Sequence, residues 1–283
     1  MNGVIVVNKE KGYTSRDVVN IVGKHLGTKK IGHTGTLDPE ACGVLVLCVG
    51  KCLKLVEMMV GHDKEYIAKV RLGIETDTLD MAGKILREER VPVLEKSDIE
   101  NILKLFKGKI RQQVPMYSAI KVNGKKLYEY ARNGIEVELP VREVEIYEIE
   151  LISDIEDNSF WIKCKVSSGT YIRSLVRDIA YKLGSVGVME SLERTSLGKF
   201  RIEESYTLDD IKNNNYKVLD IKDIVDLPRI MVDKDTELRI RNGQVLKKFF
   251  DTDMAMIVNE NEEVLAIYQV KDECYVKPYR MFL

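Results

Sequence analysis

The spacing of apolar residues along the chain predicts several strands. Continuous apolar runs over 3–7 and 43–49 indicate buried strands, and alternating apolar positions predict half-buried strands over 66–72 and 160–166. In a further alternating stretch the period slips at Tyr147-Glu148, as a β-bulge would make it. The chain therefore contains enough strand signals for one large sheet.

Apolar residues spaced three or four apart predict the helices. One helix runs from a cap at Ser15 to about residue 25, and a second is expected over 51–59. The sequence Ser97-Asp98-Ile99-Glu100 has the form of a capping box and predicts the start of a third helix. The strongest apolar face belongs to a helix over 172–183.

Strands and helices do not alternate regularly, which disfavours a doubly wound parallel sheet. We expect an α+β fold with a mixed, mainly antiparallel sheet and flanking helices over residues 1–228. After Pro228 the pattern changes to short strands separated by Asn242-Gly243 and by Asn259-Glu260-Asn261. Residues 229–283 are therefore predicted to form a small all-β module.

Charge is balanced overall and uneven locally. Forty-four Lys and Arg face 45 Asp and Glu, for a net charge of −1. Residues 107–132 carry seven basic side chains and one acidic, whereas residues 143–157 carry seven acids and no base. This distribution fits a basic face that binds phosphates, and it fits two ordinary solvated surfaces equally well.

Composition argues against several other classes of protein. The five cysteines include no CxxC pair, and the three histidines do not supply a zinc spacing. We therefore expect no metal and no disulfide framework, which indicates a reducing, cytoplasmic setting. Neither a signal-peptide pattern nor an apolar run of about 18–20 residues is present, so no membrane span is expected.

The loop Gly32-His33-Thr34-Gly35-Thr36-Leu37-Asp38-Pro39 is the best candidate for chemistry. It places one carboxylate, Asp38, between residues that restrict the backbone and directly before a buried strand. Most loop aspartates only accept hydrogen bonds from the local backbone. The density of glycine, proline and histidine around Asp38 favours a reactive group instead.

Three other side chains could act with Asp38. Arg173 stands at the start of the helix over 172–183, beside its buried face, where a carboxylate partner would be needed; pairing with Asp38 would serve both groups and keep Asp38 ionised. Tyr66 lies on a predicted strand and is either an ordinary half-buried aromatic or an aromatic platform. His33 could be a general base, although a lone loop histidine usually is not.

The sequence motifs that mark dinucleotide-binding sites, P-loops, zinc hydrolases and serine hydrolases are missing.

At these residues the sequence resembles the TruB family of bacterial tRNA pseudouridine-55 synthases. The resemblance is specific, follows the family order and covers about residues 2–210. Its blocks are the loop 32–39 with Ala41-Cys42-Gly43; Lys64-Glu65-Tyr66, Leu72-Gly73 and Thr76 to Gly83; Pro115 to Lys121 and Gly124 to Arg132; and Gly169 to Leu175, Lys182-Leu183-Gly184 and Leu192-Glu193-Arg194. Cys42 stands where the family often has threonine.

The resemblance implies an enzyme that isomerises uridine 55 in the T-arm of tRNA to pseudouridine, without a cofactor or a metal. It also implies a pseudouridine-synthase sheet with a C-terminal RNA-binding module of the PUA type. The implied roles are Asp38 as the catalytic aspartate, Tyr66 as the base-stacking tyrosine, Arg173 as the partner of Asp38, Leu192 as a pocket residue and His33 as an aid to nucleotide eversion. RNA contacts are expected from Lys64, Tyr171, Lys121, Lys125, Lys126 and Arg132.

The expected chemistry is consistent with these residues. Breaking the bond at C1′ develops positive charge on the ribose, which one carboxylate can stabilise or trap. Flipping the base out costs a few kcal/mol, and stacking on an aromatic ring recovers about 1–3 kcal/mol. The basic stretch 107–132, interleaved with tyrosines, suits an RNA backbone.

Two alternatives remain open at this point. One is an RNA-folding chaperone that binds tRNA without isomerase activity. The other is a relative guided by a separate RNA; such proteins usually carry basic extensions, whereas this chain begins two residues before its first predicted strand. No long exposed apolar surface is visible, so a monomer is expected.

Overall fold

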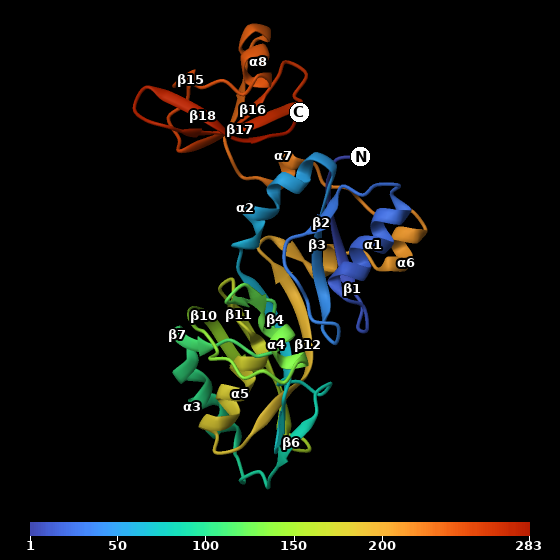
Figure 1. Cartoon of the computed structure of the whole chain (residues 1–283), viewed down its shortest axis with the longest axis vertical. Coiled ribbons are helices and arrows are strands. Elements are labelled where there is room, and N and C mark those ends of the chain that lie inside the picture. The colour runs from blue at the N-terminus through green and yellow to red at the C-terminus, as the bar shows by residue number, and fades with distance from the viewer.

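The computed structural model describes residues 1–283, with a small β-rich domain standing at one end of a larger α+β body (Figure 1). A nine-stranded sheet forms the body, in the order β1-β3-β12-β4-β11-β10-β7, with β2 beside β3 and β13 beside β12. Only β12 and β3 pair in parallel. The predicted mixed, mainly antiparallel α+β fold is confirmed. The strands are β1 (Gly3–Lys9), β2 (Ile31–His33), β3 (Cys42–Val49), β4 (Lys64–Leu72), β7 (Gly108–Gln113), β10 (Val141–Leu151), β11 (Ser159–Val166), β12 (Gly187–Leu197) and β13 (Phe200–Arg201).

Helices cover this sheet in two groups. One group packs against β1 and β3, and the other packs against β4, β10, β11 and β12 (Figure 1). None of the helices combines the length and the apolar character that crossing a bilayer requires. The helices of the body are α1 (Ser15–His25), α2 (Val56–Val60), α3 (Lys96–Phe106), α4 (Leu127–Arg132), α5 (Ile172–Lys182), α6 (Leu208–Lys212) and α7 (Ile221–Ile224), with 3₁₀ helices at Gly50–Leu55 and Ile202–Glu204.

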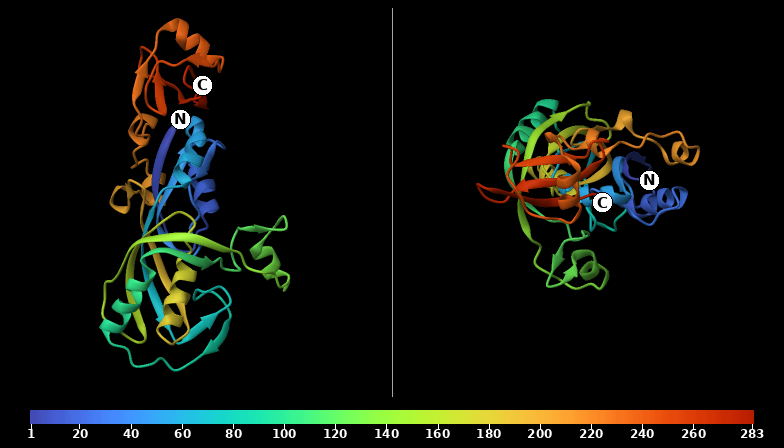
Figure 2. Two further views of the ribbon diagram at one scale, coloured as in Figure 1. Left: turned by 90° about the vertical axis from the view of Figure 1, so that its left-hand side faces the viewer. Right: turned by 90° about the horizontal axis from the view of Figure 1, so that it is seen from above.

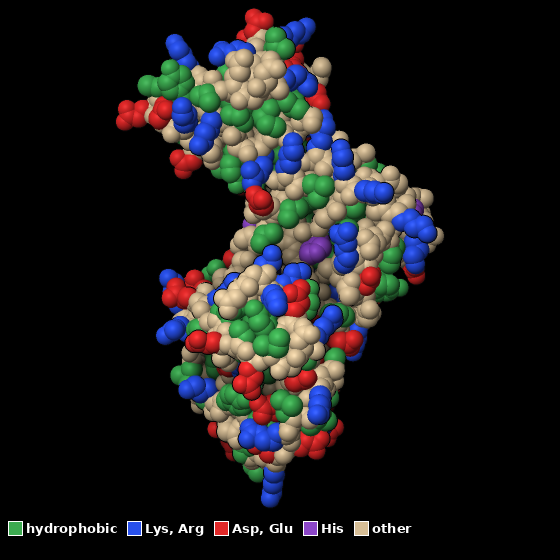
Figure 3. Space-filling view, viewed as in Figure 1, with side chains coloured by type: hydrophobic (Ala, Val, Ile, Leu, Met, Phe, Trp, Pro, Cys, Tyr) green, Lys and Arg blue, Asp and Glu red, His purple; other side chains and the backbone are tan.

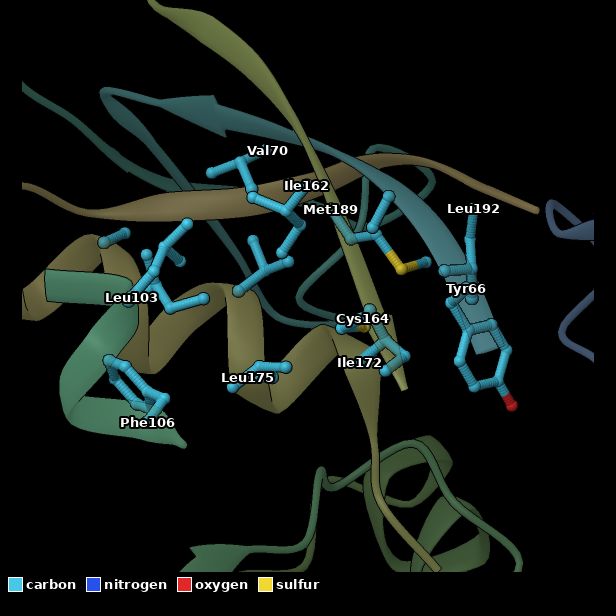
Figure 4. Packing of buried hydrophobic residues seen from close by; sticks show 14 of the residues in the cluster. Tyr66, Val70, Leu103, Phe106, Ile162, Cys164, Ile172, Leu175, Met189 and Leu192 are labelled. Carbon is cyan, nitrogen blue, oxygen red and sulfur yellow. The ribbon is translucent and has the colours of Figure 1, made fainter. Parts of the chain in front are cut away.

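The largest apolar core lies between the sheet and helices α3 and α5. It joins 22 buried residues, among them Leu103 and Phe106 of α3 and Leu175 of α5 (Figure 4). Tyr66 and Leu192 lie at one end of this cluster, and the Tyr66 hydroxyl points away from the packed side chains. The apolar core thus packs against the Tyr66 ring, and the hydroxyl end of this ring is left for polar contacts.

Two helices begin at other residues than the sequence predicts. Thr14, not Ser15, caps α1: its hydroxyl accepts from the Asp17 N–H at 3.1 Å, and the Asp17 carboxylate accepts from the Thr14 N–H at 2.9 Å. The third helix begins before Ser97, because the Asp98 carboxylate accepts from the Glu95 N–H. In both cases the nearest acid in the first turn decides the boundary.

Other local predictions hold or change slightly. The register between β10 and β11 shifts at Ile146/Glu148, so the predicted bulge is confirmed. The helix expected over 51–59 forms as a 3₁₀ helix followed by α2.

Two small hairpins lie outside the main sheet: β5 (Ile74–Thr76) pairs with β6 (Ile85–Glu88), and β8 (Lys121–Val122) pairs with β9 (Lys125–Lys126). The second hairpin and α4 belong to residues 114–140, called the arm below, which project from the body (Figure 2).

The C-terminal domain is β-rich, as predicted, although it is not all-β. Its sheet has the order β14-β16-β17-β18-β15, and it also contains helix α8 (Lys234–Arg241). Asn242 and Gly243, predicted as a turn between strands, instead end this helix, with Gly243 in the left-handed region at φ +66°. The Asn259 turn forms, its side chain accepting from two backbone N–H groups. The strands are β14 (Arg229–Met231), β15 (Leu246–Lys247), β16 (Met254–Val258), β17 (Val264–Val270) and β18 (Tyr275–Met281).

The two parts of the chain share an apolar core. Met256, Ile267 and Phe282 of the C-terminal domain belong to the same buried cluster as Val4 and Val46 of the body. The C-terminal domain is therefore packed on the body through side chains from both. The division at residue 228 and the likeness to a PUA module stay predictions.

Candidate active site

A cavity of about 470 Å³ opens where the loop before β3, strands β4 and β12, the arm and the start of α5 meet. It is lined by both polar and apolar side chains, as a site for a nucleobase would require. Six residues that the sequence analysis singled out line it, namely Asp38, Lys64, Tyr66, Tyr171, Arg173 and Leu192. These six side chains come from four separate segments of the chain, which the fold brings together.

The Asp38 loop closes the hairpin of β2 and β3 and is held from outside at two points. The Ser15 hydroxyl accepts from the Leu37 N–H at 2.9 Å and donates to the Leu37 carbonyl at 3.1 Å. The fully buried Lys9 ammonium donates to the Pro39 carbonyl at 3.2 Å. These contacts hold the residues on either side of Asp38.

Arg194 of β12 holds the same loop from the other side. Its Nε donates to the Val44 carbonyl at 2.7 Å, and its Nη2 donates to the Gly35 carbonyl at 3.1 Å. The side chain is buried and takes part in no ion pair. No role for Arg194 was predicted from the sequence, although its position is a signal: a charged residue two positions after Leu192 falls on the same buried face of a strand.

Arg173 binds Asp38 through two parallel contacts. Arg173 Nε lies 2.9 Å from Asp38 Oδ2, and Arg173 Nη2 lies 3.4 Å from Asp38 Oδ1. The Arg173 side chain is only 7% exposed, whereas that of Asp38 is 35% exposed. The pair expected from the sequence is present in the geometry, and it leaves the carboxylate accessible from the cavity.

Arg173 also ties Asp38 to two segments that the sequence analysis did not connect with it. Its guanidinium donates to the Thr78 carbonyl at 2.8 Å and to the Tyr117 carbonyl at 2.9 Å, and it lies 3.7 Å from Asp80 Oδ2. All these contacts go to one planar group, so its orientation is strongly determined. The position of Asp38 therefore depends on the turn 76–83 and on the base of the arm.

Tyr66 and Leu192 reach the cavity from neighbouring strands. In the register of β4 with β12, Tyr66 lies opposite Arg194 and Ala68 lies opposite Leu192. Burial raises the pKa of the Tyr66 phenol, and the adjacent Arg194 guanidinium opposes that rise. The phenol is neutral near pH 7, as a ring that stacks on a base should be.

Tyr171 and Lys64 border the cavity on other sides. The side chain of Gln112 accepts from the Tyr171 N–H at 2.8 Å and donates to its carbonyl at 3.1 Å, which holds Tyr171 directly before α5. Lys64 is 9% exposed and donates to the His62 carbonyl at 2.6 Å. Burial, reinforced by Arg194, lowers the pKa of Lys64 to about 8.

His33 does not line the cavity. It ends β2 beside the Asp38 loop, and its Nδ1 is buried without a hydrogen-bond partner. Burial lowers the pKa of the His33 imidazole, and Arg194 and Arg16 lower it further. The structure therefore places the His33 imidazole at the start of the loop and outside the cavity that Asp38 lines.

Two basic residues of the arm, the half-buried Lys126 and the exposed Arg132, lie beside one aromatic ring. Lys126 Nζ lies 5.3 Å from the centroid of the Tyr128 ring and the Arg132 guanidinium lies 5.4 Å from it, and Tyr128 itself lines the cavity. Lys121 and Lys125 are exposed on the two strands of the hairpin. Figure 3 shows Lys and Arg side chains along both sides of a hollow in this face of the molecule.

No group of three or more His, Cys, Asp or Glu side chains is placed to bind a metal ion. The site instead combines one accessible carboxylate, three buried or nearly buried cations and an aromatic ring within one cavity. Such a set can hold a planar base and place a carboxylate beside the sugar attached to it.

Comparisons with known proteins agree with this arrangement. Residues 24–172 match the TruB family pseudouridylate synthase N-terminal domain, and residues 173–235 match the tRNA pseudouridylate synthase B C-terminal domain. The chain is 41% identical to tRNA pseudouridine synthase B of Caldanaerobacter subterraneus, covering 100% of this chain and 99% of that protein. It is 43% identical to the protein of the same name from Shouchella clausii, over 94% of this chain and 93% of that one.

Solved structures show the same fold. One is a chain of a Cbf5-Nop10-Gar1 complex, with a TM-score of 0.73 and 24% identity, covering 99% of this chain and 85% of that chain. Another, with a TM-score of 0.72 and 23% identity over the same shares, comes from an H/ACA ribonucleoprotein bound to a substrate RNA containing 2′-deoxyuridine. Taken with the full-length sequence matches, the chain belongs to the TruB family of bacterial tRNA pseudouridine synthases.

Proposed function

We propose that this tRNA pseudouridine synthase converts uridine 55 in the T-arm of tRNA to pseudouridine, with Asp38 as the catalytic carboxylate and without a cofactor. One observation carries the assignment of Asp38: its carboxylate is bound by the buried Arg173 guanidinium at the wall of the cavity and is still 35% exposed. A carboxylate with only a local structural role would not need a buried charge partner from a distant helix.

The reaction breaks the bond between C1′ and N1, turns the base and joins C1′ to C5. Positive charge on the ribose is stabilised by a nearby carboxylate, or trapped by it as a covalent intermediate. Asp38 can also act as a base at C2′ or add to the ring, and the geometry is compatible with each step. Arg173 holds the carboxylate in the same orientation in all three cases.

The other residues bind and hold the nucleotide. Tyr66 stacks on the flipped base, Leu192 closes the pocket beside it, and His33 helps the nucleotide leave the stack. Tyr171 and Lys64 contact RNA at the cavity, and the arm follows the phosphate backbone through Lys121, Lys125, Lys126 and Arg132. We propose that the protein acts as a monomer in the cytoplasm.

The test is the conversion of a T-arm stem-loop by Asp38→Asn. This variant should form no pseudouridine, whereas its dissociation constant for RNA should change little, because the amide fills the same space. Glu40→Gln is the matched control, since Glu40 lies two residues further along and pairs with Lys11 at the surface. Full turnover by Asp38→Asn would refute the assignment.

The same assay separates the alternatives. A guided relative would need an added RNA, whereas we expect the isolated protein to convert the stem-loop alone. An RNA chaperone would bind the stem-loop and leave every uridine unchanged. Pseudouridine can be mapped in tRNA from a deletion strain by a pseudouridine-specific chemical stop, which tests which uridine the enzyme modifies. The strain should lack pseudouridine at position 55, and a loss at a different position instead would contradict the proposal.

A further inference from the structure

Two cations in the cavity have no carboxylate partner. Asp38 is the one acidic residue that lines the cavity, and its carboxylate is paired with Arg173. Lys64 and Arg194 both line the cavity and take part in no ion pair, and they are 9% and 1% exposed. Burying an uncompensated charge costs several kcal/mol, so the fold stabilises these two cations poorly when the cavity is empty.

Both cations border the same space. A Cβ atom placed on Gly35 would lie 3.7 Å from Arg194 Nη1 and 3.9 Å from Lys64 Cε, so the two side chains approach the Asp38 loop at one residue. Arg194 also lies opposite Tyr66 in the sheet and influences the phenol. The excess positive charge therefore adjoins the place where a base stacked on Tyr66 would lie.

Each cation keeps a free donor. The Lys64 ammonium has three N–H groups and donates two of them, to the carbonyls of His62 and Val60. The Arg194 guanidinium donates to three carbonyls and has five N–H groups. Both can therefore donate to an anionic ligand without losing the contacts that hold the loop.

The reaction puts negative charge on the base by any route. When C1′–N1 breaks, the electron pair stays with the uracil ring, which becomes an anion delocalised over N1 and the carbonyl oxygens. If Asp38 removes the C2′ proton, the same anion leaves, and if Asp38 adds to the ring, the charge collects on a ring carbonyl. The ring later forms the bond from C5 to C1′, loses the C5 proton and gains a proton at N1.

Building on the proposed function, we propose that Lys64, supported by Arg194, stabilises the uracil anion while it is detached from the ribose. Lys64 then acts as a catalytic residue through a charge-assisted hydrogen bond to the ring, in addition to contacting RNA. Such donors in a dry cavity lower the barrier because they are oriented before the charge appears. Arg194 contributes the second charge and holds the loop that carries Asp38.

The protonation of Lys64 gives the proposal a pH signature. The groups facing its ammonium are Arg194 on β12, His62 and Asp63 in the turn before β4, and Asp38 across the cavity. Burial and Arg194 lower the pKa of Lys64 to about 8, whereas Asp63 opposes them. The conversion rate should therefore fall above about pH 8 as Lys64 loses its proton.

The test compares Lys64→Met and Lys64→Arg in single-turnover conversion of a T-arm stem-loop at saturating RNA, across pH. Lys64→Met should lower the rate constant by about 10²-fold, the scale of one lost oxyanion donor, with thermal melting confirming the fold. Lys64→Arg should retain more of the rate and lose the decline above about pH 8, because a guanidinium stays charged. Lys165→Met, an exposed lysine on β11, is the matched control.

Three outcomes would overturn the proposal: a wild-type rate in Lys64→Met, an unchanged alkaline decline in Lys64→Arg, or a loss confined to RNA affinity. The last would leave Lys64 as an RNA contact only. These results are distinguishable from failure of the proposed function. In that case the wild-type protein itself would form no pseudouridine, or Asp38→Asn would remain active.

Discussion

The Ser15 hydroxyl forms hydrogen bonds with both backbone groups of Leu37, accepting from its N–H at 2.9 Å and donating to its carbonyl at 3.1 Å. Ser15 stands at the first position of α1, where the helix itself is capped by Thr14. A helix start thus holds the residue directly before the catalytic aspartate proposed here. This contact links the stability of the fold to the geometry of the site.

Replacing Ser15 with alanine should lower both the stability of the protein and the rate of conversion. Ser15→Ala leaves two buried polar groups of Leu37 unpaired, which should lower the free energy of unfolding by about 2 kcal/mol. The displaced Asp38 should lower the single-turnover rate by about 10- to 100-fold, with little change in RNA affinity. Thr14→Ala is the control: losing the cap costs about 1 kcal/mol and should leave the rate intact. Equal rates in both variants would contradict the role of Ser15.

Gly43 should not accept a side chain. It lies at φ +101° against β12, where a Cβ would overlap the Arg194 carbonyl oxygen and lie 2.8 Å from the Arg194 nitrogen. Gly43→Ala should therefore lower the melting temperature markedly and displace Arg194. Gly12→Ala serves for comparison, because Gly12 has φ +90° and open space around it, so only about 1–2 kcal/mol of backbone strain is expected. A similar loss in both variants would show that the contact with Arg194 does not matter.

The arm should contribute to RNA binding through charge. Lys125 is exposed on β9 and forms no ion pair, so Lys125→Ala should weaken binding and reduce the slope of log K against log salt by about 0.7–0.9. The conversion rate at saturating RNA should not change. Lys182→Ala, at the exposed end of α5, should leave the slope as in the wild type. An unchanged slope in Lys125→Ala would exclude a phosphate contact at that position.

Acid should destabilise the protein through two histidines. Burial lowers the pKa of both His33 and His62 from 6.5, so the unfolded chain binds more protons than the folded one just below that value. The free energy of unfolding should therefore fall as pH drops from about 7.5 to about 5.5, measured by urea unfolding. The double variant His33→Gln, His62→Gln should show a shallower fall. An identical slope would assign the effect to other groups.

Sequence patterns worked where local periodicity is strong and failed where it is weak. The bulge at Tyr147-Glu148 and strands β4 and β11 follow from alternating burial, and β1 and β3 follow from continuous apolar runs. Strands β2, β7, β12 and β13 were not predicted. Helix α8 was missed because it is short and polar, with only Ile240 buried, so no apolar stripe marks it. The caps of α1 and α3 were misplaced because Thr14 and Ser15, or Glu95 and Ser97, are competing polar candidates.

The sequence by itself determined the mixed sheet, the rigid loop around Asp38 and the residue types of the site, because these depend on neighbours along the chain. Only the tertiary structure decided which groups meet. Arg173 stands 135 positions from Asp38, and Ser15 stands 22 positions from Leu37. The unpaired state of Lys64 and Arg194 also emerged only there, since a charge has a partner or lacks one according to how the strands pack in space.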